Sequence, residues 1–442
     1  MKIFFVLSII IFINHCSFDT RTGIWKNESY SSKKKENKVF EDFKKISISE
    51  QLFNKTIAFT GDLVSTIPVP MINNQWQDVF YNSNNNSKNF KYNNSNKIAF
   101  KSQKLTNAKI DNYKLFIDGN LIVSDKKGNI ILYSLDNEKI ILKFNFYKKK
   151  FKRIKKNLNL LVEKNIIYVA DNLGYVYALN YKKNKVIWAK NYKIPFNSNI
   201  KIFKEKIFVS NQNNNLFILN KTDGSLIKSI PTEEFVIKNK FTNNLSYNDN
   251  EELFYLNSFG SLYSINLKSN EVNWFNNFNQ STNLTTSDLF EGSIIVNSDK
   301  IVIISSNDNT YLIDSNSGSV IKRLNFSTKI KPIIMNNFIF FISKNNYLIS
   351  LNLNTNEFLY SYNIGALIEV SEKTVNNLSL NSFMILNNEI FIFFDNSQVA
   401  NIDINGKFKK LFKLPSKINS FPISIDSGIL YLNNKNKLVF LL

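Results

Sequence analysis

The side chains with the strongest intrinsic chemistry are scarce in this sequence of 442 residues, which contains one cysteine, Cys16, and one histidine, His15. They follow Met1-Lys2 and the apolar run Ile3–Ile13, which is too short to span a bilayer and is typical of a secretory signal peptide. Cleavage before Cys16 removes His15. The remaining chain then has no His-based triad, no His/Cys zinc site and no disulfide framework, so these kinds of chemistry are excluded.

Cys16 itself has a second interpretation. Its position at the end of the apolar run resembles that of the lipidated cysteine of bacterial lipoproteins, which becomes the mature N-terminus and carries acyl chains. Ser17 follows it, where an Asp would mark retention at the inner membrane, so the resemblance implies the outer membrane. The alternative is an ordinary signal peptide with an incidental cysteine.

The stretch after Cys16 is polar and lysine-rich as far as about Gly61 and shows no sustained apolar period, which is typical of a tether. We therefore predict three parts. Residues 1–15 form a signal peptide, residues 16–66 carry the lipidated Cys16 on a flexible tether, and residues 67–442 form the folded domain.

The net charge is +21, from 56 basic and 35 acidic residues, and it raises the question of a nucleic-acid or anionic-membrane partner. The densest basic cluster runs from Lys148 to Lys156. No nucleic-acid motif accompanies it, so we interpret it as a solvated loop and expect no nucleic-acid partner. A lipid-facing role for the cluster remains open if Cys16 is acylated.

Asn165–Lys190 shows the unit from which the folded domain is built. Ile166–Ala170, Tyr175–Leu179 and Val186–Trp188 are apolar and aromatic runs that suit strands, and they are separated by Asn-, Asp- and Gly-containing turns. Gly174 occupies a turn position where other copies carry Asn, and both residue types tolerate a left-handed conformation.

The unit recurs along the chain. Each copy ends its third strand with an apolar residue followed by Asp or Asn, and these markers are separated by 44, 40, 46, 48, 38 and 51 residues. They are Asp136, Asn180, Asn220, Asn266, Asp314, Asn352 and Asp403. A tryptophan follows the next turn at Trp188 and Trp274, and Asn214, Asn309 and Asn346 stand where Gly174 stands in its copy.

Four strands in about forty-five residues, repeated in this way, indicate an all-β β-propeller of four-stranded antiparallel blades. Gly428–Phe440 is an eighth copy that ends after its third strand, which would leave an unpaired sheet edge. We predict that a strand at Asn74–Phe80, containing Trp76, completes this blade. The ring then has eight blades closed by N- and C-terminal strands, with seven blades as the alternative.

The run D-N-L-G-Y-V-Y-A-L-N followed by V-I-W, at Asp171–Trp188, resembles the PQQ-type propeller repeat. Together with the signal peptide, Cys16, the tether and eight blades, it resembles the BamB family of lipoproteins in the outer-membrane β-barrel assembly (BAM) machine. The resemblance implies a non-enzymatic scaffold without a cofactor, lipid-anchored at the periplasmic face of the outer membrane. The implied partners are the periplasmic domains of BamA, the other BAM lipoproteins and unfolded outer-membrane proteins.

Members of that family are expected to hold BamA through loops near the connection after the third blade, at an apolar-x-apolar-basic run. Phe235, Ile237 and Lys238 fit that run. An apolar pair beside a cation on a loop is a plausible anchor for a partner's edge strand. The alternative is that these residues simply begin the inner strand of the next blade.

An enzyme is the rival interpretation. PQQ-dependent dehydrogenases resemble this repeat too, and that family binds a quinone in the propeller axis and uses a catalytic Asp, a metal and often a cysteine pair. Asp125 and Asp171 are carboxylates at turn positions, where structural hydrogen bonding explains them, and the chain has a single cysteine. We predict no catalysis. A secreted propeller that binds another periplasmic ligand is the third possibility.

Overall fold

A computed structural model describes residues 16–19, 24–27, 53–233, 242–278, 294–306, 308–328, 330–369 and 379–442. The chain divides into two compact units, Met1–Gln51 and Leu52–Leu442. In the first unit, the described residues form an antiparallel pair of strands, β1 (Cys16–Asp19) and β2 (Ile24–Asn27). All other described elements belong to the second unit.

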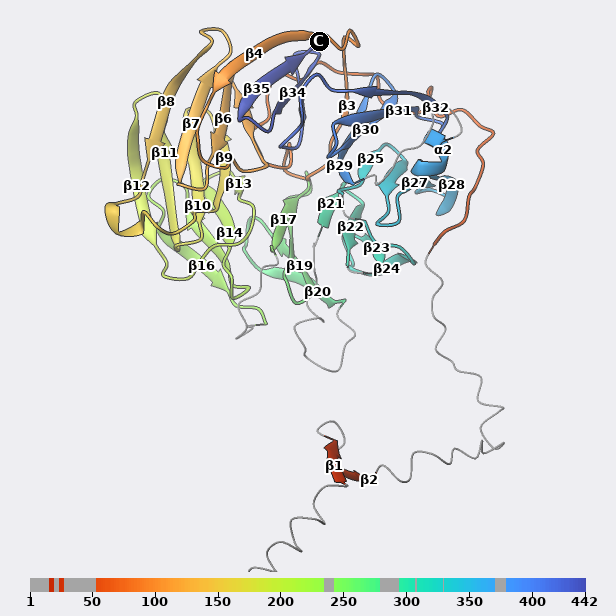
Figure 1. The fold of residues 1–442 in the computed structure, drawn as a ribbon. Coiled ribbons are helices and arrows are strands. Elements are labelled where there is room, and N and C mark those ends of the chain that lie inside the picture. Colours follow the sequence, from red (N-terminus) through yellow and green to blue (C-terminus); the bar gives the residue numbers. More distant parts are fainter. Residues whose placement is uncertain are drawn as a thin grey trace, which may run out of the picture. The chain divides into compact units, whose positions relative to one another are not determined.

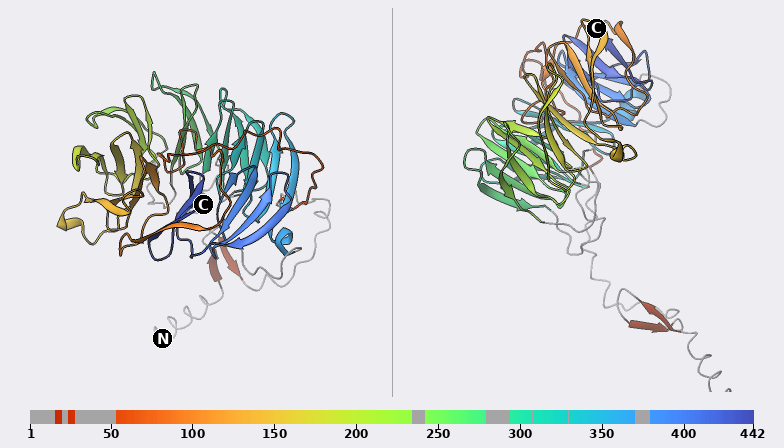
Figure 2. Two further views of the ribbon diagram at one scale, coloured as in Figure 1. Left: turned by 90° about the horizontal axis from the view of Figure 1, so that it is seen from above. Right: turned by 90° about the vertical axis from the view of Figure 1, so that its left-hand side faces the viewer.

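The second unit consists of eight antiparallel sheets that follow one another in chain order around an axis (Figures 1 and 2). The first four blades comprise β5 (Leu115–Ile117), β6 (Asn120–Ser124), β7 (Asn129–Ser134) and β8 (Lys139–Asn145); β9 (Leu158–Glu163), β10 (Ile166–Asp171), β11 (Tyr175–Asn180) and β12 (Lys185–Asn191); β13 (Lys201–Phe203), β14 (Lys206–Ser210), β15 (Leu216–Asn220) and β16 (Leu226–Ile230); and β17 (Asn244–Tyr247), β18 (Glu252–Leu256), β19 (Ser261–Asn266) and β20 (Val272–Asn277). A short 3-10 turn, η3 (Lys149–Phe151), lies between the first two blades.

The other four blades repeat the arrangement. They comprise β21 (Ile294–Asn297), β22 (Ile301–Ser305), β23 (Thr310–Asp314) and β24 (Val320–Leu324); β25 (Ile333–Met335), β26 (Phe338–Ile342), β27 (Tyr347–Asn352) and β28 (Glu357–Asn363); β29 (Leu380–Leu386), β30 (Glu389–Phe394), β31 (Gln398–Asp403) and β32 (Phe408–Lys413); and β33 (Ile423–Ile425), β34 (Gly428–Leu432), β35 (Lys437–Leu441) and β4 (Ile98–Lys104). The short strand β3 (Asn89–Phe90) joins the seventh blade in parallel with β29, and a six-residue helix, α2 (Ile364–Glu369), follows β28.

The burial of each strand depends on its place in the blade. Middle strands such as β10 are almost entirely buried because neighbouring blades cover both faces, whereas in the outer strand β12 only Trp188 is buried. Apolar clusters fill the spaces between consecutive blades, and one of them joins residues of the last blade, such as Leu438, to Val123 and Tyr133 of the first. The prediction of a closed, eight-bladed, all-β propeller is therefore confirmed.

The strand that closes the ring is not the one predicted. The outer strand of the eighth blade is β4, which pairs with β35 through Phe100–Phe440 and Lys101–Val439 (Figure 1). Trp76 instead exchanges backbone hydrogen bonds with Phe116 on the inner strand β5. The prediction was wrong because an apolar residue pattern alone does not say whether a strand joins the outer edge of a blade or its inner edge.

The turns between the second and third strands follow the expected geometry in most blades. Gly174, Asn214 and Asn346 have φ values of 84°, 66° and 61°, the left-handed conformation that Gly and Asn tolerate. Asn309 does not share it.

The tryptophans of the repeat join neighbouring blades. Trp188 on β12 donates from Nε1 to the carbonyl of Lys221, 3.0 Å away, and its ring covers Gly224 in the next blade. Trp274 on β20 makes the same pair of contacts one step further round, to the Ser315 carbonyl at 2.9 Å and to Gly318. The glycines leave the space that each indole ring fills.

Residues 53–66, assigned to the tether from sequence, lie against the sixth and seventh blades within the second unit. Ile57 pairs with Ser361 on β28, with N–O distances of 2.9 and 3.0 Å in the two directions. Leu63 and Ile67 are buried in the apolar cluster between these blades. This approach leads the chain toward the axis, where residues 73–90 lie.

Candidate functional site

The axis of the propeller contains a stretch of its own chain, residues 73–90, which we call the axial segment. Backbone or side-chain hydrogen bonds connect it to the inner strand of each of the eight blades. The partners, from the eighth blade round to the seventh, are Ser424 and Asp426, Phe116, Val162, Lys201, Leu245 and Tyr247, Ile295 and Asn297, Ile334, and Leu386 with Asn387 and Asn388. The segment therefore acts as a common inner lining for the ring.

The asparagines of the segment explain how one loop can satisfy so many strands. A side-chain amide both donates and accepts, so it can bond a strand's N–H and C=O groups where the loop backbone does not reach. Asn85 Nδ2 donates to the carbonyls of Leu245 (2.9 Å) and Ile295 (3.1 Å), which belong to different blades. Asn86 bonds both backbone groups of Ile334, donating to its oxygen at 2.8 Å and accepting from its nitrogen at 2.9 Å.

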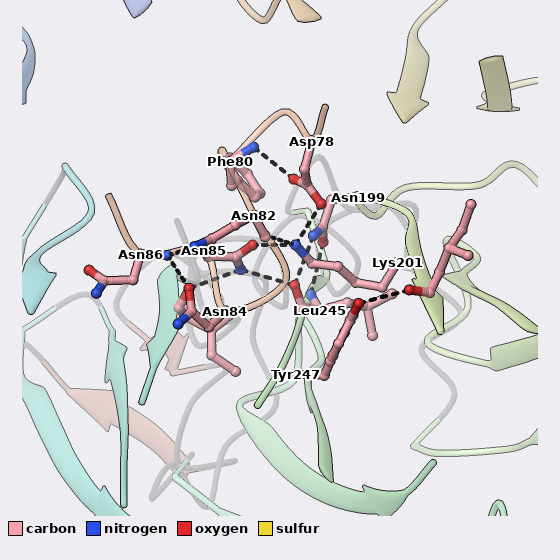
Figure 3. Close-up of polar contacts among 12 residues, drawn as sticks. Asp78, Phe80, Asn82, Asn84, Asn85, Asn86, Asn199, Lys201, Leu245 and Tyr247 are labelled. Carbon is pink, nitrogen blue, oxygen red and sulfur yellow. Dashed lines mark hydrogen bonds and ion pairs between the residues drawn. The ribbon is translucent and has the colours of Figure 1, made fainter. Parts of the chain in front are cut away.

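A buried ion pair fixes the middle of the segment. Lys201 on β13 is 1 % exposed at its side chain, and its Nζ lies 2.7 Å from the Asp78 carboxylate. The same ammonium donates to the Asn82 carbonyl (2.7 Å) and to Asn85 Oδ1 (2.6 Å), so all three of its hydrogens are used (Figure 3). Burial lowers the pKa of Lys201, and the attraction of Asp78 opposes that shift.

Two cavities adjoin the axial segment. One, of about 410 Å³, is lined mainly by the segment's amides, with Tyr247 and Glu163. The other, of about 360 Å³, lies where the inner strands begin, and we call it the axial cavity. It is lined by Trp76 and Phe80 of the segment and by residues preceding the inner strands, including Tyr113, Lys114, Lys331 and Phe421.

Two lysines line the axial cavity. Lys114 is 2 % exposed and donates from Nζ to the Phe421 carbonyl, and burial lowers its pKa to about 7. Lys331 Nζ lies 3.1 Å from the centroid of the Phe80 ring, a cation–π contact. Burial, and then repulsion from Lys201, hold the pKa of Lys331 well below its usual range. The cavity therefore places two lysine amino groups beside aromatic rings, and the lowered pKa of each favours its neutral form.

The chain is similar in sequence pattern and in fold to known propellers. A family model described as "Outer membrane protein assembly factor BamB" (PQQ_2) matches residues 155–362. The BamB structure from Moraxella catarrhalis superposes with a TM-score of 0.60 at 11 % identity, over 77 % of this chain and 99 % of that one. No curated protein matches the sequence.

Dehydrogenases superpose equally well. Quinohemoprotein alcohol dehydrogenase from Comamonas testosteroni gives a TM-score of 0.60 at 9 % identity, over 83 % of this chain and 80 % of that one. A europium-containing methanol dehydrogenase gives 0.60 at 11 %, over 83 % and 89 %. The family model, the repeat and the eight blades agree. Residues 155–362 carry a PQQ-like repeat, and the chain has the fold of a PQQ-like propeller. At these identities the structural likeness shows the fold, which BamB and the dehydrogenases share.

The site residues predicted from sequence do not belong to the axial segment. Cys16 lies in β1 in the first unit, and its predicted lipidation stays a prediction. Phe235, Ile237 and Lys238, the predicted partner anchor, lie outside the described residues, in the connection between β16 and β17. Their proposed role stays a prediction.

The two turn carboxylates have the structural hydrogen bonds expected of them. Asp171 is fully buried and accepts from the backbone nitrogens of Leu173 and Tyr175, both at 2.8 Å, and from the Tyr147 hydroxyl at 2.5 Å. Burial raises the pKa of Asp171, and these hydrogen bonds oppose the rise. Asp125 is also fully buried and accepts from the backbone nitrogens of its own turn. Both carboxylates stabilise turns of the PQQ-like repeat.

The sequence reasoning missed the axial segment and the two cavity lysines. Lys114 and Lys331 are two of 56 basic residues and no motif distinguishes them. The one available signal was the asparagine-rich run from Asn82 to Asn86, which is also the composition of an ordinary loop.

The described residues contain no group of three or more His, Cys, Asp or Glu side chains placed to hold a metal ion. None of their helices has the length and apolarity needed to cross a bilayer.

Proposed function

We propose that this PQQ-like propeller is a non-enzymatic lipoprotein scaffold of outer-membrane protein assembly. In this proposal it is anchored through Cys16 at the periplasmic face of the outer membrane and binds BamA. The family model described as an outer membrane protein assembly factor supports the assignment, and so does the superposition on 99 % of the BamB chain. A dehydrogenase superposes on this fold as well as BamB does, so similarity alone does not separate the scaffold from an enzyme. A feature of this chain itself has to favour the scaffold.

The axial segment is the observation that carries the proposal. The competing enzyme would hold a quinone on the propeller axis, and here residues 73–90 contact the inner strand of each blade around that axis. A ring linked in this way is a rigid frame from which loops can be presented. Rigidity serves binding because a partner then loses less conformational freedom in the complex.

The connection between the third and fourth blades begins at a residue that is fixed by hydrogen bonds to the fourth blade. Glu233, the last described residue before it, accepts hydrogen bonds from Asn257 (2.9 Å), Ser261 (2.7 Å) and Tyr263 (3.0 Å) of the fourth blade. The anchor predicted from sequence, Phe235, Ile237 and Lys238, begins two residues later. In the proposal, Phe235 and Ile237 fill an apolar pocket on BamA while Lys238 meets a carboxylate or carbonyl beside it.

Affinity capture from detergent-solubilised membranes tests this function. The wild-type chain should recover BamA and the other BAM lipoproteins, and the double variant Phe235→Asp/Ile237→Asp should lose at least nine-tenths of the recovered BamA. Ile187→Asp is the matched control, because Ile187 is an exposed apolar residue (48 %) on the outer strand β12 of the second blade. Failure of the wild type to recover BamA, or equal recovery by the double variant, would refute the proposed contact.

The anchor is tested separately. Cys16→Ser should move the protein from the membrane fraction to the soluble periplasmic fraction and abolish acylation detectable by mass spectrometry of the N-terminal peptide. An unmodified N-terminus in the wild type would remove the lipoprotein part of the proposal and leave a secreted scaffold.

The alternative function, a secreted propeller that binds a quinone as a dehydrogenase, is favoured by the similarity to a quinohemoprotein alcohol dehydrogenase. Titration with pyrroloquinoline quinone, combined with a dye-linked assay of alcohol oxidation, separates the two. Stoichiometric binding together with turnover would replace the scaffold proposal with the enzyme.

A further inference from the structure

The axial cavity has the size and position of a ligand site. Its volume of about 360 Å³ falls within the range of small-molecule sites in proteins, roughly 300–1,000 Å³. Its lining includes Trp76 and Phe80 of the axial segment and residues that precede the inner strands of different blades. A ligand here would therefore contact several blades at once.

The cations that line this cavity lack a counter-ion among the described residues. Asp78 is the nearby carboxylate, and it is already engaged 2.7 Å from Lys201. Lys114 donates to a backbone carbonyl, and Lys331 lies over the Phe80 ring, and neither has a described carboxylate within ion-pairing distance. Each ammonium has three donors, so both retain hydrogen-bonding capacity. A buried cation without an anion is costly, and an anion supplied from outside removes that cost.

The two lysines determine which ligand groups fit the cavity. Both bring hydrogen-bond donors, and an ammonium has no acceptor of its own. Trp76 lines the cavity with its ring, and its indole Nε1–H, which is unpaired among the described residues, is buried away from solvent. A ligand that satisfies Lys114 and Lys331 must therefore supply acceptor oxygens.

The rest of the lining combines apolar side chains with amides and hydroxyls, and it includes three aromatic rings beside the lysines. Phe80, Tyr113 and Phe421 line the cavity, and Tyr113 and Phe421 contact each other with ring centroids 5.3 Å apart. Such walls favour a ligand with an apolar body, since an inorganic anion would leave them in contact with water. The lysine donors and the apolar part of the lining together indicate a ligand with an anionic group and an apolar body.

We propose that the axial cavity binds a small organic acid, with its carboxylate at Lys114 and Lys331 and its apolar body against Phe80, Tyr113 and Phe421. The site goes beyond the scaffold function and does not depend on it, because none of these residues belongs to the predicted BamA anchor.

Isothermal titration calorimetry of the full mature chain with 3-phenylpropionate tests the site, and the uncharged 3-phenylpropionamide is the matched ligand. The carboxylate should bind at least tenfold more tightly than the amide, because charge-assisted hydrogen bonds are about twice as strong as neutral ones. Fluorescence of Trp76 should change on binding, and the change should disappear in Trp76→Phe.

Lys331→Met and Lys114→Met should each weaken binding of 3-phenylpropionate at least tenfold. Lys149→Met, at an exposed lysine in η3, is the control and should bind as the wild type does. Circular dichroism and the unfolding midpoint verify that each variant is folded. If Lys114→Met fails to fold, Lys331→Met tests the site alone, because Lys331 is less buried and its substitution should disturb the fold less.

Equal affinity for the carboxylate and the amide, or wild-type affinity in a folded Lys331→Met variant, would overturn the proposal. The result is independent of BamA capture, which can fail while 3-phenylpropionate still binds.

Discussion

The Lys201 ammonium and the Asp78 carboxylate form a buried ion pair, 2.7 Å apart, between an inner strand of the third blade and the axial segment. Lys201 also donates to Asn82 and Asn85, so one side chain fixes three points of the segment (Figure 3). Asn85 in turn donates to strands of the fourth and fifth blades. Through Lys201 and Asn85, the third, fourth and fifth blades are therefore all connected to the same part of the axial segment.

Removing one partner of this pair should destabilise the whole propeller. In Asp78→Asn the Lys201 cation stays buried without its counter-charge, and we expect the free energy of unfolding in urea to fall by roughly 3–5 kcal/mol. The double variant Asp78→Leu/Lys201→Met removes both charges and should be more stable than Asp78→Asn. If Asp78→Asn unfolds at the same urea concentration as the wild type, the pair does not hold the segment.

The contact between Trp188 and Gly224 gives a second prediction, at the junction of the second and third blades. A Cβ atom on Gly224 would lie 2.5 Å from the Trp188 ring, and Gly224 has a φ of 70°. Gly224→Ala should therefore destabilise the propeller by about 1–3 kcal/mol, because it both displaces the indole and strains the backbone.

The control for that variant is Gly365→Ala in α2, where φ is not left-handed and the nearest neighbour of an added Cβ is Asn363 Oδ1 at 3.2 Å. It should be neutral or slightly stabilising. Thermal unfolding followed by circular dichroism compares the two. Equal midpoints would mean that the indole moves aside at no cost.

The repeat was readable from sequence because its signals are local. Turn residues such as Gly174 and the apolar runs on either side of them recur in every copy, and counting the copies gives the number of blades. The closing strand was assigned to Asn74–Phe80 and is β4, because both stretches contain aromatic residues with strand propensity. Only pairing to the rest of the ring distinguishes an outer strand from an inner lining.

The axial segment could not be read from sequence for a different reason. Its asparagines bond backbone groups of strands that lie more than a hundred residues away, such as Asn86 with Ile334. Nothing in the local pattern of Asn82–Asn86 separates this function from that of a solvated loop. Lys114 and Lys331 likewise acquire their significance from the cavity that the assembled blades create.

Stability should rise with pH between about 7 and 9.5. Burial lowers the pKa of Lys114 in the folded chain to about 7, from about 10.5 in the unfolded chain, so in this window the unfolded chain binds more protons. The pKa values of Lys201 and Lys331, which adjoin the same axial segment, are lowered too and act in the same direction. Tyrosines such as Tyr92, whose pKa is raised to about 12, oppose the trend only above pH 10.

The free energy of unfolding at pH 9.5 should exceed that at pH 6.5 by an amount on the order of 3 kcal/mol from Lys114 alone. Urea unfolding at the two pH values measures it. Lys114→Met should flatten the dependence, while the exposed Lys149→Met should leave it unchanged. A wild-type stability that falls over this range would show that Lys114 keeps its charge at little cost in the folded chain.

Asn86 provides the sharpest test of the axial segment as a lining for the blades. Its amide makes two hydrogen bonds with the backbone of one residue, donating to the Ile334 oxygen at 2.8 Å and accepting from the Ile334 nitrogen at 2.9 Å, and Asn86→Leu leaves both of these groups unpaired. Each buried polar group left unsatisfied costs about 1–3 kcal/mol, so we expect a loss of roughly 2–6 kcal/mol in unfolding free energy.

Asn74→Leu, at an exposed position of the same segment, should cost less than about 0.5 kcal/mol. Hydrogen exchange of the Ile334 amide should accelerate in Asn86→Leu and not in Asn74→Leu. Unchanged protection in both variants would mean that the sixth blade holds its inner strand without the segment.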